Sequence, residues 1–115
     1  MAEVIPAASF LRDLKPLAKK FPSLLAEVAK LAELLARQPQ MGTPLGNGCF
    51  KIRLAVKSKG TGKRGGMRIV TQVVAFRQAE EVYLLTIYDK SAQANYSDAQ
   101  LRAALAEITE LRNRK

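Results

Sequence analysis

The chain has no histidine and no tryptophan, and Cys49 is its single cysteine. Without histidine, it lacks the side chain that most often transfers protons at neutral pH. A lone thiol cannot form an internal disulfide, and without a histidine partner it is a poor nucleophile, so we expect Cys49 to be a small buried residue. The shortage of metal-binding side chains also excludes a zinc site. We therefore expect no cofactor and no metal.

Long apolar runs are also missing, although hydrophobic residues make up 48% of the chain. No run approaches the length of about 20 residues that a membrane-spanning helix needs. Residues 1–15 lack the basic start and apolar centre of a signal peptide. We therefore expect a cytoplasmic protein that does not contact the membrane. The 115 residues fit one domain with one core, covering residues 1–115.

Acidic side chains are absent from the middle of the chain. Residues 34–79 contain nine lysines and arginines and no carboxylate, whereas the rest of the chain contains ten of each sign. The whole net charge of +9 therefore comes from this segment. Such a segment is typical of proteins that bind nucleic acid or an acidic partner, and a merely solvated basic face is the simpler alternative. Without nearby carboxylates, a Mg²⁺-assisted phosphodiester site is not expected.

Hydrophobic periodicity predicts the order of the secondary-structure elements. A short strand over 3–5 precedes a helix over 8–21, which we expect to kink or break near Lys15 because Pro16 lacks a backbone donor. A helix over 24–36 completes a helical hairpin. After a loop over 38–48, strands are expected over 49–57, 67–76 and 81–88, and a Ser-x-x-Gln capping box at 97–100 begins a last helix that ends near residue 112. Three successive strands favour an antiparallel meander within an α+β fold.

The strand over 49–57 alternates between apolar and basic residues. Lys51, Arg53 and Lys57 stand between apolar residues, which predicts one apolar face and one cationic face. Arg68 begins the next strand and would lie across from this cationic face if the two strands pair antiparallel. Clustered cations repel one another, and the phosphate of RNA is one anion that would relieve this repulsion.

A cationic cluster of this kind also suits the cleavage of RNA without a metal. Neighbouring cations lower the pKa of a lysine, which could then take the proton from a ribose 2′-OH. Arginine would stabilise the charge of the phosphorane. The product would carry a 2′,3′-cyclic phosphate.

A glycine-rich loop over 58–66 carries Lys59, Lys63 and Arg64. It differs from a nucleotide-binding P-loop because Arg64 follows Lys63 and because the loop leads into a strand. As a mobile basic loop it would suit a nucleic-acid backbone, and the alternative is a plain hairpin loop kept soluble by its charge. Tyr88 and Lys90 close the third strand, where a tyrosine would stack on a base, assist proton transfer or simply pack on the edge of the core.

Three segments resemble, in this order, the RelE/ParE superfamily of type II toxin–antitoxin toxins, most closely a RelE/HigB-like branch. They are FLRDLKPLAKKFPSL, GTPLGNGCFKIRLAVKSKGTGKRGGMRIVTQVV and VYLLTIYDKSAQANYSDAQL. The resemblance implies a helical hairpin packed on a small twisted antiparallel sheet of three to four strands, with a C-terminal helix. It implies a ribosome-dependent, metal-independent mRNA endoribonuclease that inhibits translation. It also implies an antitoxin that covers the basic surface, with a homodimer or a toxin–antitoxin hetero-oligomer as the assembly.

The resemblance also assigns site residues. The basic site of the family falls on Lys51, Arg53 and Arg68. The position of an arginine that follows the last strand falls on Lys90, and that of a site tyrosine on either Tyr88 or Tyr96. The residues expected to bind rRNA or mRNA are Lys57, Lys59, Lys63 and Arg64. Two alternatives share the fold, namely a ParE-like toxin that inhibits DNA gyrase without nuclease activity and a relative that binds nucleic acid without cutting it.

Overall fold

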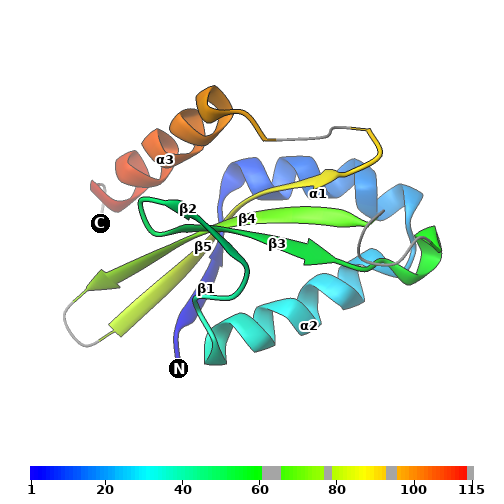
Figure 1. The fold of residues 1–115 in the computed structure, drawn as a ribbon, viewed down its shortest axis with the longest axis horizontal. Coiled ribbons are helices and arrows are strands. Elements are labelled where there is room, and N and C mark those ends of the chain that lie inside the picture. The colour runs from blue at the N-terminus through cyan, green and yellow to red at the C-terminus, as the bar shows by residue number, and fades with distance from the viewer. Residues whose placement is uncertain (61–65, 77–78, 93–95, 114–115) are drawn as a thin grey trace.

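The computed structural model describes residues 1–60, 66–76, 79–92 and 96–113. In this part of the chain, three α-helices pack against a five-stranded sheet (Figure 1). The elements are β1 (Glu3–Pro6), α1 (Ala8–Lys20), α2 (Leu24–Arg37), β2 (Thr43–Gly46), β3 (Cys49–Leu54), the 3-10 turn η1 (Lys57–Lys59), β4 (Met67–Phe76), β5 (Ala79–Asp89) and α3 (Asp98–Asn113). The α+β class and the order of the predicted helices and strands are confirmed.

The sheet is mixed, with the strand order β1-β5-β4-β3-β2. The strands β3, β4 and β5 form the expected antiparallel meander. The expectation of a purely antiparallel sheet is wrong, because β1 pairs parallel to β5, from Glu3 opposite Glu81 to Pro6 opposite Leu84. Such a parallel pair needs a long connection, which the helices and the other strands provide.

A fifth strand lies in the segment expected to be a loop. Strand β2 pairs antiparallel with β3 through a turn at Asn47 and Gly48, whose φ angles are 55° and 75°. An Asn-Gly pair is the preferred sequence of a tight hairpin turn because both residues tolerate positive φ. The predicted strand over 49–57 is also shorter in the structure. It ends at Leu54, and Lys57 to Lys59 form the turn η1.

Helix α1 continues without a break through Pro16, so of the kink or break expected near Lys15 the break is wrong. Pro16 lies on the exposed side of the helix, whereas Phe10 and Leu14 on the opposite side are buried in the core. Each of these two buried side chains contributes roughly 1.5–3 kcal/mol, which together offsets the ~3 kcal/mol cost of a proline in a helix interior. The helical hairpin of α1 and α2 is therefore retained.

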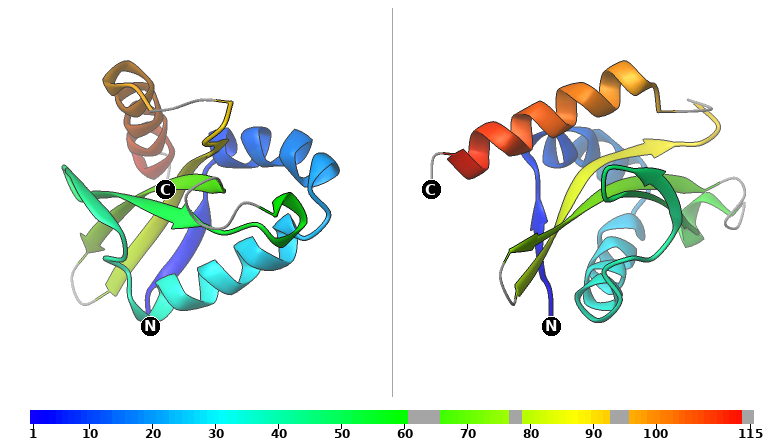
Figure 2. Two further views of the ribbon diagram at one scale, coloured as in Figure 1. Left: turned by 45° about the vertical axis from the view of Figure 1, so that its right-hand side comes forward. Right: turned by 60° about the vertical axis from the view of Figure 1, so that its left-hand side comes forward.

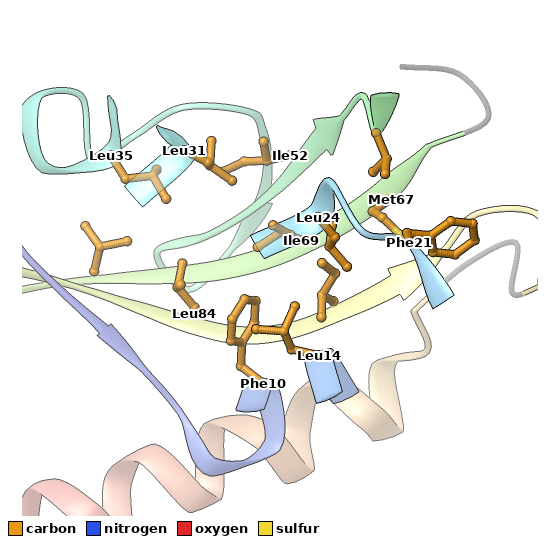
Figure 3. Close-up of a cluster of buried hydrophobic side chains, with 13 residues drawn as sticks. Phe10, Leu14, Phe21, Leu24, Leu31, Leu35, Ile52, Met67, Ile69 and Leu84 are labelled. Carbon is orange, nitrogen blue, oxygen red and sulfur yellow. The ribbon is translucent and has the colours of Figure 1, made fainter. Parts of the chain in front are cut away.

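Each face of the sheet is covered by its own hydrophobic cluster. The hairpin of α1 and α2 covers one face with a cluster that Figure 3 shows, which includes Phe10, Leu14, Phe21, Leu24, Leu31, Leu35, Ile52, Met67, Ile69 and Leu84. Helix α3 covers part of the other face (Figure 2). There Ala104 and Ile108 pack in a cluster with Val70 and Leu85. Cys49 is buried in this second cluster, and burial raises the pKa of its thiol.

Candidate functional site

A row of three polar side chains crosses β3, β4 and β5 on the face that α3 partly covers. Arg53 lies opposite Arg68, and Arg68 lies opposite Tyr88. Residues directly opposite each other in antiparallel strands point to the same face, with their Cβ atoms about 5 Å apart. Lys51 lies two residues before Arg53 and opposite Val70, so it shares that face. We call the three residues Arg53, Arg68 and Tyr88, together with Lys51 beside them, the cross-strand row.

The apolar alternation of the strands produces the cross-strand row. Ile52, Met67 and Ile87 point into the cluster beneath the helical hairpin. Their neighbours Arg53, Arg68 and Tyr88 must therefore point to the opposite face, because successive side chains of a strand alternate. The expectation that Arg68 lies across from the cationic face of β3 is met by the observed register.

Burial increases along the cross-strand row. Arg53 is exposed and Lys51 is half-buried, whereas the exposed fractions of Arg68 and Tyr88 are 4% and 6%. The Nη1 atom of Arg68 donates a hydrogen bond of 3.2 Å to the Met67 carbonyl oxygen. An anion that approaches this face therefore meets Arg53 and Lys51 before it reaches the deeper guanidinium group.

Tyr96 lies against the buried end of the cross-strand row. The rings of Tyr88 and Tyr96 stack with their centroids 6.1 Å apart and an interplanar angle of 12°. The Tyr96 hydroxyl donates a hydrogen bond of 3.1 Å to the Gln100 carbonyl oxygen in α3. The structure thus brings together the two tyrosines between which the sequence could not choose.

The environment of both tyrosines keeps their hydroxyl groups protonated. Burial raises the pKa of Tyr88, although the charge of Arg68 and the nearby backbone of Tyr96 offset part of the rise. No hydrogen bond of good geometry reaches the buried Tyr88 hydroxyl from the described residues. Burial, followed by the charges of Asp13 and Glu107, raises the pKa of Tyr96. Both hydroxyls are therefore protonated at neutral pH and can donate a proton, and the raised pKa makes each a weaker acid than an exposed tyrosine.

Lys59, which we expected to bind RNA, lies on the other side of the sheet. Its Nζ atom pairs with Asp89 at 3.1 Å, donates to the Ser91 hydroxyl at 3.0 Å and lies 6.0 Å from the ring centroid of Phe21. Asp89 is opposite Met67, whose side chain belongs to the cluster beneath the helical hairpin. Lys59 is therefore engaged within the chain, on the face opposite Arg53.

The other predicted site residues lie near the same end of the sheet. Lys57 is exposed in η1, and its backbone N–H donates to the Glu27 carboxylate at 2.8 Å. Lys90 is half-buried, and its backbone N–H donates to the Gly66 carbonyl oxygen at 3.1 Å. Lys63 and Arg64 lie outside the described residues.

A cavity of about 560 Å³ adjoins the cross-strand row between α1, the end of β5 and α3. Tyr88 and Tyr96 line it together with Asp13 and Glu107, two carboxylates that sequence reasoning did not single out. Asp13 accepts a hydrogen bond of 2.6 Å from the Thr86 hydroxyl, and Glu107 accepts one of 3.2 Å from the Ser9 backbone N–H. No sequence signal marks these carboxylates, because acidic residues on helices are common. The described residues include no group of three or more side chains able to hold a metal ion.

The fold and the cross-strand row define a small α+β protein with a cationic sheet face that ends in tyrosine. The family model described as the RelE toxin of the RelE/RelB toxin–antitoxin system matches residues 17–114. The chain belongs to this family and is thus a toxin of a toxin–antitoxin system, as the sequence resemblance predicted.

The toxin RelE of E. coli, solved in the free state as a variant with two arginines replaced by alanine, superimposes with a TM-score of 0.58. The two proteins are 23% identical, and the match covers 89% of this chain and 98% of that chain, so it establishes the shared fold. No curated protein gave a significant match. Within the described residues, no helix has the length and apolar character needed to cross a membrane.

Proposed function

We propose that this toxin is a ribosome-dependent endoribonuclease that cuts mRNA and thereby stops translation. The observation that carries the proposal is the register that aligns Arg53, Arg68 and Tyr88 across three strands, with Lys51 beside them. This arrangement places cations and a proton donor on one face, which is what phosphodiester cleavage by side chains alone requires. Membership of the RelE toxin family supports the same activity.

The proposed reaction is an internal transfer of the phosphodiester. Lys51, as general base, takes the proton from the ribose 2′-OH, and the 2′ oxygen attacks the phosphorus. Arg53 and Arg68 stabilise the negative charge that develops on the phosphorane oxygens. The bond to the 5′ oxygen breaks, and the acid protonates this leaving group. The products carry a 2′,3′-cyclic phosphate and a 5′-OH.

The acid in this scheme comes from the stacked pair Tyr88 and Tyr96. Tyr88 lies opposite Arg68, and its hydroxyl is protonated at neutral pH because the pKa of tyrosine, which burial raises further here, lies well above 7. Tyr96 is half-buried and therefore easier for a substrate to reach. Lys90 follows the strand that carries Tyr88, and we assign it to the same site as a further cation.

The proposed partners follow from the charge of the protein. Arg53, Lys57 and the loop residues Lys63 and Arg64 are proposed to contact the phosphates of rRNA or mRNA. The antitoxin is proposed to cover this basic surface and so to keep the toxin inactive. We further propose that residues 1–115 act as a single domain in the cytoplasm.

Cleavage of mRNA on translating ribosomes tests the proposal. The purified protein is incubated with ribosomes stalled on a defined mRNA, and new 5′ ends are mapped by primer extension. We expect cuts at A-site codons that disappear in Lys51→Ala and Arg68→Ala. The matched control is Lys30→Ala, which removes an exposed lysine from α2 and should cut like the unmodified protein. Intact mRNA with a folded, growth-arresting protein would contradict the proposal, and a DNA supercoiling assay would then test gyrase inhibition.

A further inference from the structure

Lys59, whose side chain is largely shielded from solvent, joins three segments of the chain at the end of the sheet where the cross-strand row lies. Lys59 belongs to η1, its partner Asp89 is the last residue of β5, and Phe21 follows the last turn of α1. The Lys59 and Asp89 side chains are only 10% and 9% exposed. A pair this far from solvent is costly to break, because separation would remove the opposite charge that offsets the loss of hydration.

The Asp89 carboxylate also fixes the turn that follows β5. Its Oδ1 atom accepts hydrogen bonds from the Ser91 backbone N–H at 3.0 Å and from the Ser91 hydroxyl at 2.7 Å. Lys90 lies between Asp89 and Ser91 in the sequence, and its backbone N–H donates to the Gly66 carbonyl oxygen at 3.1 Å. These interactions fix the backbone on the C-terminal side of Tyr88.

The turn η1 is anchored on its other side to the start of α2. The Ser58 backbone N–H donates to the Ser23 hydroxyl at 2.9 Å, and the Ser23 backbone N–H donates to the Ser58 hydroxyl at 3.2 Å. The Glu27 carboxylate accepts from the Lys57 backbone N–H at 2.8 Å and from the Ser23 hydroxyl at 2.9 Å. The position of η1 is therefore set by α2, and Lys59 extends that restraint to the end of β5.

We propose that Lys59 and Asp89 are positioning residues that hold the end of β5, and with it Tyr88 and Lys90, against η1. In this role Lys59 does not contact RNA, although it lies in the basic segment. The effect on cleavage rests on the function proposed above, whereas the restraint on the backbone does not. A shift of about 1 Å in a reacting group can cost up to about 100-fold in rate, so loss of this restraint should be visible in turnover.

The salt dependence of ribosome binding separates a positioning lysine from one that binds a phosphate. Removal of a lysine that neutralises one phosphate lowers the slope of log K against log salt by roughly 0.7–0.9. We expect Lys59→Met to keep the slope of the unmodified protein while cleavage at saturating ribosomes falls about 10- to 100-fold. Lys57→Met removes an exposed lysine that is proposed above to contact a phosphate, so this variant should lower the slope and serves as the contrast to Lys59→Met. A slope that falls by this amount in Lys59→Met would overturn the proposal.

Asp89→Asn provides the complementary test because it makes the protein more positive. If charge alone mattered, this variant would bind RNA more tightly and cut at least as fast. We expect its cleavage to fall as in Lys59→Met, and the double variant to be no slower than the slower single variant, because both remove one interaction. Additive losses in the double variant would contradict a shared role.

Hydrogen exchange tests the restraint without ribosomes. We expect faster exchange of the Lys90 and Ser91 backbone amides in Lys59→Met and Asp89→Asn, and unchanged exchange in Lys57→Met. Ser91→Ala, which removes a single hydroxyl, should show the same change to a smaller degree if the stronger variants fold poorly. If the variants exchange faster but the unmodified protein never cuts mRNA, the proposed restraint on the backbone stands and the proposed nuclease function is refuted. Unchanged exchange, or faster exchange with full cleavage, would refute the positioning role.

Discussion

Arg53 and Arg68 lie directly opposite each other on neighbouring antiparallel strands, with both side chains on the same face of the sheet. Like charges in such a cross-strand pair destabilise the fold by roughly 0.2–1 kcal/mol. A bound phosphate would reverse the sign of this effect because it lies between two cations. The toxin should therefore be more stable when an anion is bound between Arg53 and Arg68 than when it is free.

We expect Arg53→Gln to raise the melting temperature of the free protein slightly and to lower cleavage of mRNA. A short RNA made uncleavable by 2′-O-methyl groups should stabilise the unmodified protein against heat, and it should stabilise Arg53→Gln less. Thermal unfolding with and without this RNA measures both effects. Lys30→Gln on α2 is the control for removal of a charge elsewhere. Equal stabilisation of all three proteins would place the RNA away from the cross-strand row.

The two stacked tyrosines are separated by substitutions that remove only a hydroxyl. General acid catalysis typically contributes about 10²- to 10⁴-fold, so the phenylalanine variant of the acid should lose that much turnover. Because the Tyr88 hydroxyl is buried without a well-formed hydrogen bond to the described residues, Tyr88→Phe should leave stability nearly unchanged. The rate of single-turnover cleavage by Tyr88→Phe and by Tyr96→Phe shows which of the two tyrosines is the general acid. Full activity in both variants would mean that the acid is not a tyrosine.

The cationic part of the cross-strand row could be predicted from sequence, because the alternation along β3 is local and Arg68 needed only an antiparallel pairing to share its face. The pattern of β3 and the position of Arg68 were enough to expect the face that the structure shows. The pairing of Lys59 with Asp89 could not be predicted, because it joins residues thirty positions apart and depends on where β3 ends. The parallel pairing of β1 with β5 is equally non-local. By contrast, the Asn-Gly turn before β3 was a local signal for β2 that the prediction of a loop overlooked.

The pair formed by Lys59 and Asp89 also predicts how stability depends on pH. Burial alone would raise the pKa of Asp89, but hydrogen bonds from Ser91 and Lys59 and the charge of Lys59 outweigh it, so the pKa lies below its ordinary value of 3.8. A depressed carboxyl pKa stabilises the folded state above the unfolded pKa, and this stability is lost as the pH falls toward the folded pKa. We expect Asp89→Asn to cost roughly 1–3 kcal/mol at pH 7, because Lys59 loses the carboxylate that balances its charge in a site largely closed to solvent.

Urea unfolding of both proteins at pH 7 and pH 3 measures this effect. The difference in free energy of unfolding between the unmodified protein and Asp89→Asn should shrink at pH 3, where the unfolded carboxyl is largely protonated. Asp98→Asn, at the exposed start of α3, serves as the control for removal of a carboxylate. A difference for Asp89→Asn that is the same at both pH values would show that Asp89 does not titrate with folding.

The turn between β2 and β3 should tolerate no side chain at Gly48. Its φ of 75° disfavours any other residue, and an added Cβ would lie 2.8 Å from the Val73 carbonyl oxygen. We expect Gly48→Ala to destabilise the protein by about 1–3 kcal/mol, through backbone strain and the displacement of β4. Gly46→Ala is the matched control. Its φ of 91° is also strained, but an added Cβ meets no atom within 4 Å. Thermal unfolding should therefore show the larger loss of stability in Gly48→Ala, and equal losses would mean that strain alone, without the clash with Val73, sets the cost.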